Sequence, residues 1–132
     1  VDVGTNQLDV SLRNDSRVVS MEQTDIRTLA PVDVVDLIVI DVSFISLTNI
    51  VEFLGPWGAG AVIALIKPQF EVPREIAARY NGVIKSVDWH EYSITRVIDS
   101  FAQYGFENRG ITQSPIHGGS GNTEFLGYFV RQ

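Results

Sequence analysis

The chain has 132 residues, the usual size of one domain, and 45% of them are apolar, which is enough for a single core. Its formal net charge is −6 and no stretch is rich in lysine and arginine, so composition offers no electrostatic signature of nucleic-acid binding. The absence of cysteine excludes disulfides and thiolate metal sites, and His90 and His117 have no metal-ligand spacing, so we expect no metal site.

The N-terminal residues predict a short strand, a turn and a short helix. Residues 1–3 alternate apolar, acidic and apolar and are followed by Gly4-Thr5-Asn6, a pattern typical of a strand end that enters a turn. Leu8 and Leu12 have helical spacing, and the string RVVSM at 17–21 predicts a second short strand. The chain opens on Val1 without methionine, so we expect further sequence upstream.

The middle of the chain predicts a strand, a helix and another strand. Residues 36–42 form a continuous β-branched run, which is typical of a strand buried on both faces of a parallel sheet. In 47–54 the apolar residues have helical spacing, and Gly55-Pro56 ends that helix. Residues 61–66 are the next buried strand.

The C-terminal part completes an α/β pattern. Residues 70–83 predict a long loop with at most one helical turn, and 88–105 predict an amphipathic helix that ends at Gly105. Two strands follow, at 108–113 and 125–130, joined by the glycine-rich string SPIHGGSGN. We therefore expect a doubly wound, Rossmann-like fold whose sheet is mostly parallel with an antiparallel C-terminal strand.

Each of the two buried strands ends on a single charge, Asp41 in the first and Lys67 in the second. The carboxyl ends of parallel strands meet at one edge of the sheet, where ligands of this fold class bind. A structural ion pair or a solvated strand end is the alternative for each charge taken alone. Two charges at equivalent positions, with Asp2 at the end of an earlier predicted strand, favour a functional site.

Several strings together closely resemble one protein family. These are VDVGTNQLDVSLRND, TDIRTL, DLIVIDVSFISL, ALIKPQFE and SPIHGGSGNTEFL. They resemble the TlyA or haemolysin A family of FtsJ-like, S-adenosylmethionine-dependent methyltransferases, and the similarity runs nearly from end to end. The resemblance implies a cytoplasmic enzyme that methylates a ribose 2′-hydroxyl of ribosomal RNA, with ribosomal RNA or a ribosomal subunit as its partner.

The resemblance also implies a catalytic set. Asp41, Lys67 and Glu124 match three members of the family's Lys-Asp-Lys-Glu tetrad. The first lysine, the first strand with its glycine-rich loop, and a small S4-like RNA-binding domain would lie upstream, so residues 1–132 would be a partial methyltransferase domain that is inactive alone. Lys67 would steer or deprotonate the ribose hydroxyl, while the carboxylates of Asp41 and Glu124 orient the lysine.

The remaining positions implied by the resemblance concern the cofactor. Asp2 would bind the ribose hydroxyls of S-adenosylmethionine, although an aspartate before Gly-Thr is also typical of a turn. Asp25 would lie near the adenine, with an ordinary helix N-cap as the alternative. Val3 and Ile26 would flank the adenine, and Asp41 would contact the cofactor as well as Lys67.

Two other functions are compatible with parts of this pattern. The first is a non-catalytic interaction module that keeps the fold and has lost the reaction. The second is a membrane-active haemolysin, as the family's older name suggests, but the longest uncharged apolar run, 53–66, is too short and too broken to span a bilayer. A lysine and a glycine-rich loop upstream would favour the enzyme over the module. The sequence does not determine the oligomeric state.

Overall fold

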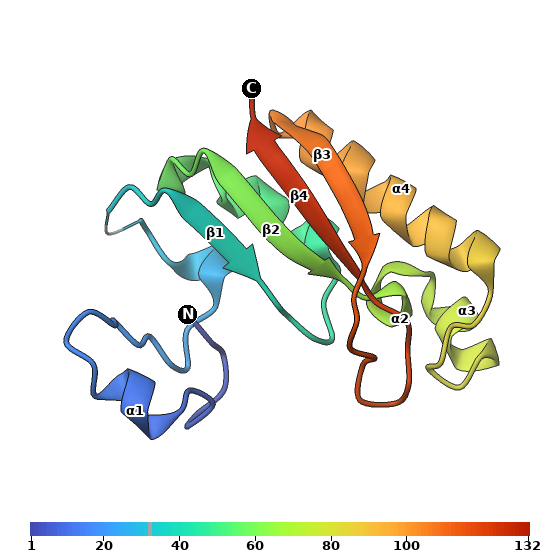
Figure 1. The fold of residues 1–132 in the computed structure, drawn as a ribbon, viewed down its shortest axis with the longest axis horizontal. Coiled ribbons are helices and arrows are strands. Elements are labelled where there is room, and N and C mark those ends of the chain that lie inside the picture. Colours follow the sequence, from blue (N-terminus) through green and yellow to red (C-terminus); the bar gives the residue numbers. More distant parts are fainter. Residues whose placement is uncertain (32) are drawn as a thin grey trace. The chain divides into compact units, whose positions relative to one another are not determined.

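The computed structural model describes residues 1–31 and 33–132, which form two compact units (Figure 1). The units are Val1–Val32 and Asp33–Gln132, and each is described by itself. The first unit is small and irregular, whereas the second contains the sheet and the long helix.

The first unit contains two short helices, α1 at Val10–Arg13 and a 3-10 helix at Ile26–Thr28. The helix expected around Leu8 and Leu12 is therefore confirmed in shorter form as α1. The Asp9 side chain accepts a hydrogen bond from the Ser11 N–H at 2.8 Å, which caps the start of α1.

The strands predicted at 1–3 and 17–21 are wrong. The Asp2 N–H donates to the Met21 carbonyl at 2.9 Å, and the Thr24 N–H donates to the Asp2 carbonyl at 3.0 Å, but no regular ladder forms. The Asp2 carboxylate accepts a hydrogen bond from the Gly4 N–H at 2.7 Å and turns the chain immediately. Such local side-chain bonds compete with strand pairing and explain the miss.

The second unit is built on a four-stranded sheet in the order β1-β2-β4-β3. β1 and β2 are parallel, and β4 is antiparallel to both of its neighbours. Three strands thus run in one direction and only the C-terminal strand is reversed, which confirms the expected sheet. The strands are β1 at Leu37–Ile40, β2 at Ala61–Ile66, β3 at Phe106–Gln113 and β4 at Phe125–Arg131.

One face of this sheet packs against the long helix α4, Val87–Gln103, which lies along β3 and β4 in Figure 1. Side chains of a strand alternate between faces, and every second residue of β2 is fully buried on this side. The core is aromatic at its centre. Phe101 of α4 stacks on Phe129 of β4, with ring centroids 4.0 Å apart, and Phe106 of β3 adds an edge contact.

The prediction that the run 36–42 is buried on both faces is wrong. Ile40 is buried, but Leu37 and Val39 are 46% and 68% exposed. β1 is an edge strand, and its side chains point alternately to opposite faces of the sheet. Only the face that carries Ile40 meets the core. The continuous hydrophobic run therefore predicted more burial than β1 has.

Two connecting segments differ from the prediction in local structure. Residues 47–57 form three successive 3-10 helices in place of one α-helix, although the expected apolar positions are buried. The Thr-Asn-Ile-Val run has low helix propensity, which explains the tighter turns. The segment expected as a loop contains α2, Pro68–Glu71, and α3, Arg74–Arg79, because Ile76 is buried against Val72 and Ile84.

We expect Phe101→Ala to lower the free energy of unfolding by about 3 to 5 kcal/mol, because it removes a ring that is fully buried between two others. Urea denaturation followed by circular dichroism measures this change. The matched control is Tyr104→Ala at the end of the same helix, which is 43% exposed and is expected to cost about 1 kcal/mol or less. Equal losses for the two variants would contradict this description of the core.

Candidate active site

The three residues that the sequence assigns to catalysis lie at one edge of the sheet. Asp41 follows the last residue of β1, and Lys67 follows the last residue of β2. Glu124 immediately precedes β4, whose first residue, Phe125, pairs with Ile66 at the end of β2. An antiparallel strand begins where its neighbour ends, so Glu124 enters the site from the opposite chain direction.

Lys67 is the best-connected of these residues. Its Nζ lies 2.8 Å from Asp41 Oδ1 and donates to Ser43 Oγ at 3.1 Å. The lysine side chain is only 13% exposed, whereas that of Asp41 is 68% exposed. β1 leaves the sheet opposite Ala64, three positions before Lys67, so the long lysine side chain can reach the residues after β1.

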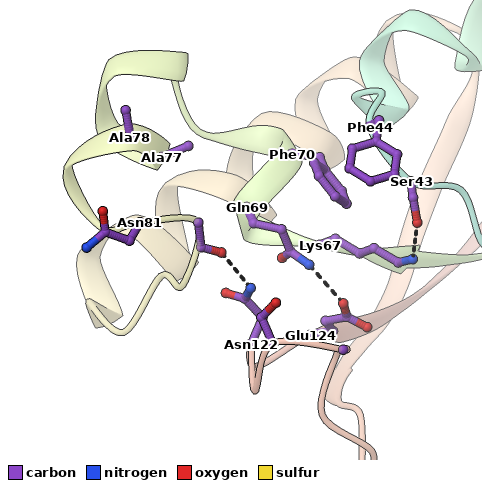
Figure 2. Close-up of a pocket in the computed structure, with 13 residues that line it drawn as sticks. Ser43, Phe44, Lys67, Gln69, Phe70, Ala77, Ala78, Asn81, Asn122 and Glu124 are labelled. Carbon is purple, nitrogen blue, oxygen red and sulfur yellow. Dashed lines mark hydrogen bonds between the residues drawn. The ribbon is translucent and has the colours of Figure 1, made fainter.

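Glu124 has a different partner. It is 6% exposed and accepts a hydrogen bond from Gln69 Nε2 at 3.0 Å, while Gln69 Oε1 is buried with no partner among the described residues (Figure 2). No ion pair joins Lys67 and Glu124 in the described part of the chain. Gln69 was not predicted from the sequence, although its place two residues after Lys67 in KPQFE was the available signal.

The glycine-rich segment before β4 is tied down by Asn122. This residue is 2% exposed, and its side chain accepts from the Ile84 N–H at 2.8 Å and donates to the Gly82 carbonyl at 2.7 Å. A Cβ atom at Gly118 would collide with the carboxylate of Glu124, so this glycine is required for close approach. The segment therefore positions Glu124 and is more than a flexible turn.

Lys67, Gln69, Asn122 and Glu124 line an open pocket of about 710 Å³, and Asp41 does not. Lys67, Gln69 and Glu124 form its polar part, and α3 contributes Ala77 and other side chains to the opposite wall (Figure 2). Beside the lysine, Phe44 lies against Phe70 with ring centroids 5.2 Å apart.

Phe44 is unusual in two respects. Its side chain is 90% exposed, and its backbone is in the left-handed region at φ 64°. A non-glycine residue in this region costs about 1 to 3 kcal/mol, and such strain is most common at functional sites. An exposed aromatic ring at the rim of a polar pocket is suited to contact a planar ligand.

Glu71, at the end of α2, is a second buried carboxylate beside Glu124. It was also not predicted from the sequence. It is 1% exposed. Burial raises the pKa of its carboxyl above the ordinary value, while hydrogen bonds from Ser46 and Leu47 and the charge of Arg96 act in the opposite direction. Burial of the Glu71 carboxylate is unfavourable, and its hydrogen bonds and the nearby charge of Arg96 compensate for part of that cost.

The residues predicted to bind the cofactor lie in the first unit, apart from Asp41. Asp25 is the N-cap of the 3-10 helix, and hydrogen bonds from Arg27 lower the pKa of its carboxyl to about 2. Asp2 is exposed and bonds to Gly4. Val3 is 71% exposed and Ile26 is half-buried. The capping and turn alternatives for the two aspartates are thus both present, and neither excludes a ligand, since a carboxylate has further lone pairs.

Two features are absent from residues 1–31 and 33–132. No cluster of histidine, aspartate and glutamate is arranged to hold a metal ion. No helix in these ranges has the length and apolar character needed to cross a membrane.

Comparisons with known proteins identify similar sequences and structures. Residues 1–131 match the family described as FtsJ-like methyltransferase. YqxC of Bacillus subtilis, a candidate rRNA methyltransferase, is 42% identical over 96% of this chain and 47% of its own length. The 16S/23S rRNA (cytidine-2′-O)-methyltransferase TlyA of Mycobacterium tuberculosis is 38% identical over 95% of this chain and 48% of its own length.

A solved structure supports the same relationship. It is a candidate hemolysin from Streptococcus thermophilus, with a TM-score of 0.92 and 43% identity, and the match covers 98% of this chain and 49% of that one. The chain thus spans about half the length of the curated relatives it matches.

Gly118→Ala should displace the Glu124 carboxylate from Gln69, because the added methyl group occupies the position of that carboxylate. We expect the side-chain amide resonances of Gln69 to shift in NMR spectra. Gly119→Ala is the matched control, since an added methyl group there meets nothing within 4 Å. Unchanged Gln69 resonances in the Gly118 variant would contradict the close packing described above.

Proposed function

Because the chain belongs to the FtsJ-like methyltransferase family, we propose that the natural protein methylates a ribose 2′-hydroxyl of ribosomal RNA and uses S-adenosylmethionine as the donor. The observation that carries this proposal is the position of Lys67. Its side chain is largely buried, its ammonium group is bonded to Asp41 and Ser43, and it lines a pocket that is also lined by Glu124. The proposal includes the S4-like RNA-binding domain and the first strand with its glycine-rich loop, which the sequence analysis expects before Val1.

The chemistry requires alignment and removal of one proton. S-adenosylmethionine supplies an electrophilic methyl group, so the protein has only to orient the hydroxyl oxygen and accept its proton. Lys67, whose Nζ is held by two partners, steers the hydroxyl as the ammonium or, as the neutral amine, takes its proton. Asp41 orients Lys67 directly. Glu124, held by Gln69, orients the hydroxyl from the same polar part of the pocket.

The cofactor-binding residues in the first unit have chemistry that fits a nucleoside. The exposed Asp2 carboxylate can accept hydrogen bonds from ribose hydroxyls, and Val3 and Ile26 offer apolar contact to a purine ring. Asp25 has a carboxylate already bonded to Arg27, so it contributes only its remaining lone pairs to an adenine amino group. In the second unit, Asp41 is exposed enough to bond the cofactor as well as Lys67.

The aromatic pair beside Lys67 favours a nucleotide substrate. A ribose can reach a catalytic group only when its base is accommodated, and exposed aromatic rings commonly stack on unpaired bases. Phe44 is exposed and is supported from behind by Phe70. We propose that Phe44 contacts the base of the nucleotide that is methylated.

The distribution of charge supports an RNA partner despite the negative total. In the described residues, Arg74, Arg79 and Lys85 are exposed and make no side-chain hydrogen bond or ion pair. Arg74 and Arg79 lie in α3, the helix that forms one wall of the pocket, and Lys85 lies in the connection between α3 and α4. Unpaired cations beside the pocket are suited to contact phosphates of the RNA backbone.

The non-catalytic module remains the second candidate, but one feature argues against it. A module that had lost the reaction would have no use for a lysine whose side chain is only 13% exposed and whose ammonium group is bonded to a carboxylate in an open pocket. The family match and the rRNA methyltransferase relatives favour the enzyme.

In the complete natural protein, Lys67→Ala should lower the rate of methyl transfer to ribosomal RNA by about 100-fold or more, with cofactor affinity nearly unchanged, because the lysine acts on the hydroxyl. Asp41→Ala should lose both rate and cofactor affinity. A methylation assay beside calorimetry separates the two effects. Arg109→Ala is the control, since this exposed residue pairs only with Glu107 on β3. Full turnover by the Lys67 variant would refute the assignment.

Replacing Arg74, Arg79 and Lys85 together by glutamine should weaken RNA binding and reduce the slope of log affinity against log salt concentration by about 2, if all three contact phosphates. Binding titrations at several salt concentrations measure this slope. Arg109→Gln changes an exposed but paired cation and should leave the slope unchanged. An unaltered slope in the triple variant would exclude the α3 segment from the RNA interface.

A further inference from the structure

Glu71 is the last residue of α2, the short helix that begins directly after Lys67. The two central residues of this helix line the pocket, since Gln69 bonds to Glu124 and Phe70 lies against Phe44. Glu71 is instead 1% exposed and is not among the residues that line the pocket. It therefore contacts neither ligand nor solvent, and its role has to be found in the residues that it bonds.

Both oxygens of the Glu71 carboxylate bind the segment that follows β1. Ser46 Oγ donates to Oε2 at 2.5 Å, and the Leu47 N–H donates to Oε1 at 2.8 Å. On the other side, Arg96 of α4 lies 3.9 Å from Oε2 and also donates to the Glu71 backbone carbonyl. The carboxylate thus links α2, α4 and the residues at 46–47.

The segment held in this way carries two residues that line the pocket and Asp41, the partner of Lys67. It begins at Asp41, where β1 ends, contains Ser43 and Phe44, and reaches Glu71 at Ser46 and Leu47. Asp41 and Phe44 are exposed, so apart from the contact between Phe44 and Phe70 packing does little to fix them. The positive φ of Phe44 adds a strained backbone that persists only when the surrounding structure holds it.

We propose that Glu71 is a positioning residue for the pocket. It holds the Ser46–Leu47 end of the segment 41–47, and β1 holds the other end, so Asp41, Ser43 and Phe44 stay beside Lys67. This inference rests on the proposed methyltransferase function and adds a residue that acts through its neighbours. A buried carboxylate is costly compared with an apolar side chain of similar size, so positioning accounts for a feature that stability alone does not require.

Glu71→Gln and Glu71→Leu in the complete natural protein form the matched pair that tests this role. Glutamine can replace both bonds, because its amide oxygen accepts from the Leu47 N–H and its amide nitrogen donates to Ser46 Oγ. Leucine keeps most of the volume and removes both acceptors. We expect the leucine variant to lose about 10- to 100-fold in kcat with little change in the KM for S-adenosylmethionine, and the glutamine variant to retain most of the activity.

A second pair of measurements separates positioning from a general loss of stability. Ser46→Ala removes the hydroxyl that donates to the Glu71 carboxylate. We expect its loss of kcat to be non-additive with that of Glu71→Leu. NMR amide resonances of residues 41–47 should shift in the leucine variant and stay close to wild type in the glutamine variant. All assays are run well below the melting temperature of each variant, so unfolding does not contribute.

The outcomes are distinct. Wild-type kcat in a folded Glu71→Leu variant, additive losses in the double variant, or unshifted resonances of 41–47 would each overturn the positioning role. If the leucine variant does not fold, Ser46→Ala decides the matter by its kcat and its amide resonances. Failure of the proposed function appears differently, as an absence of methyl transfer by the wild type or full turnover by Lys67→Ala. The resonance measurements remain informative in that case.

Discussion

The ion pair between Lys67 and Asp41 is the interaction on which the arrangement of the site depends. A lysine side chain that is only 13% exposed has few water partners left for its ammonium group, so the group needs a carboxylate and a further acceptor close by. Parallel pairing of β1 and β2 supplies them, because it brings the residues after both strands to one edge of the sheet. The partner carboxylate stays largely exposed, which leaves it available for additional contacts and keeps the pair from being a closed structural bridge.

The string KPQFE shows how a short segment can serve several parts of one site. Lys67 bonds across to the residues after β1, and Gln69 holds Glu124, which comes from the other end of the chain. Phe70 supports Phe44 at the rim. Successive residues of a helical turn point in different directions, so one turn of α2 can reach neighbours on several sides. Gly118 completes the arrangement, because only a residue without a side chain allows the Glu124 carboxylate its position.

Net charge and local charge have different consequences in this protein. The total of −6 is unfavourable for association with RNA over long distances. Most cations of the described residues are bonded to carboxylates, to backbone carbonyls or, in the case of Arg13, to the Asn6 side chain. The others, Arg74, Arg79 and Lys85, lie in α3 or between α3 and α4. Short-range contacts are less screened than the field of the whole molecule, so a few cations beside the pocket can orient a backbone phosphate even on an acidic domain.

The sequence by itself determined the succession of the main strands and the long helix along the chain, and the reversed direction of the C-terminal strand. It also placed Asp41 and Lys67 at the same edge of the sheet. Hydrophobic runs and chain connectivity control these features. The sequence predicted two N-terminal strands that do not form, since a hydrophobic pattern does not reveal the bond between the Asp2 side chain and the backbone. The tertiary structure alone decided the bond between Gln69 and Glu124 and the buried contacts of Glu71. These join residues far apart in sequence, and polar side chains acquire their partners only when packing has brought the segments together.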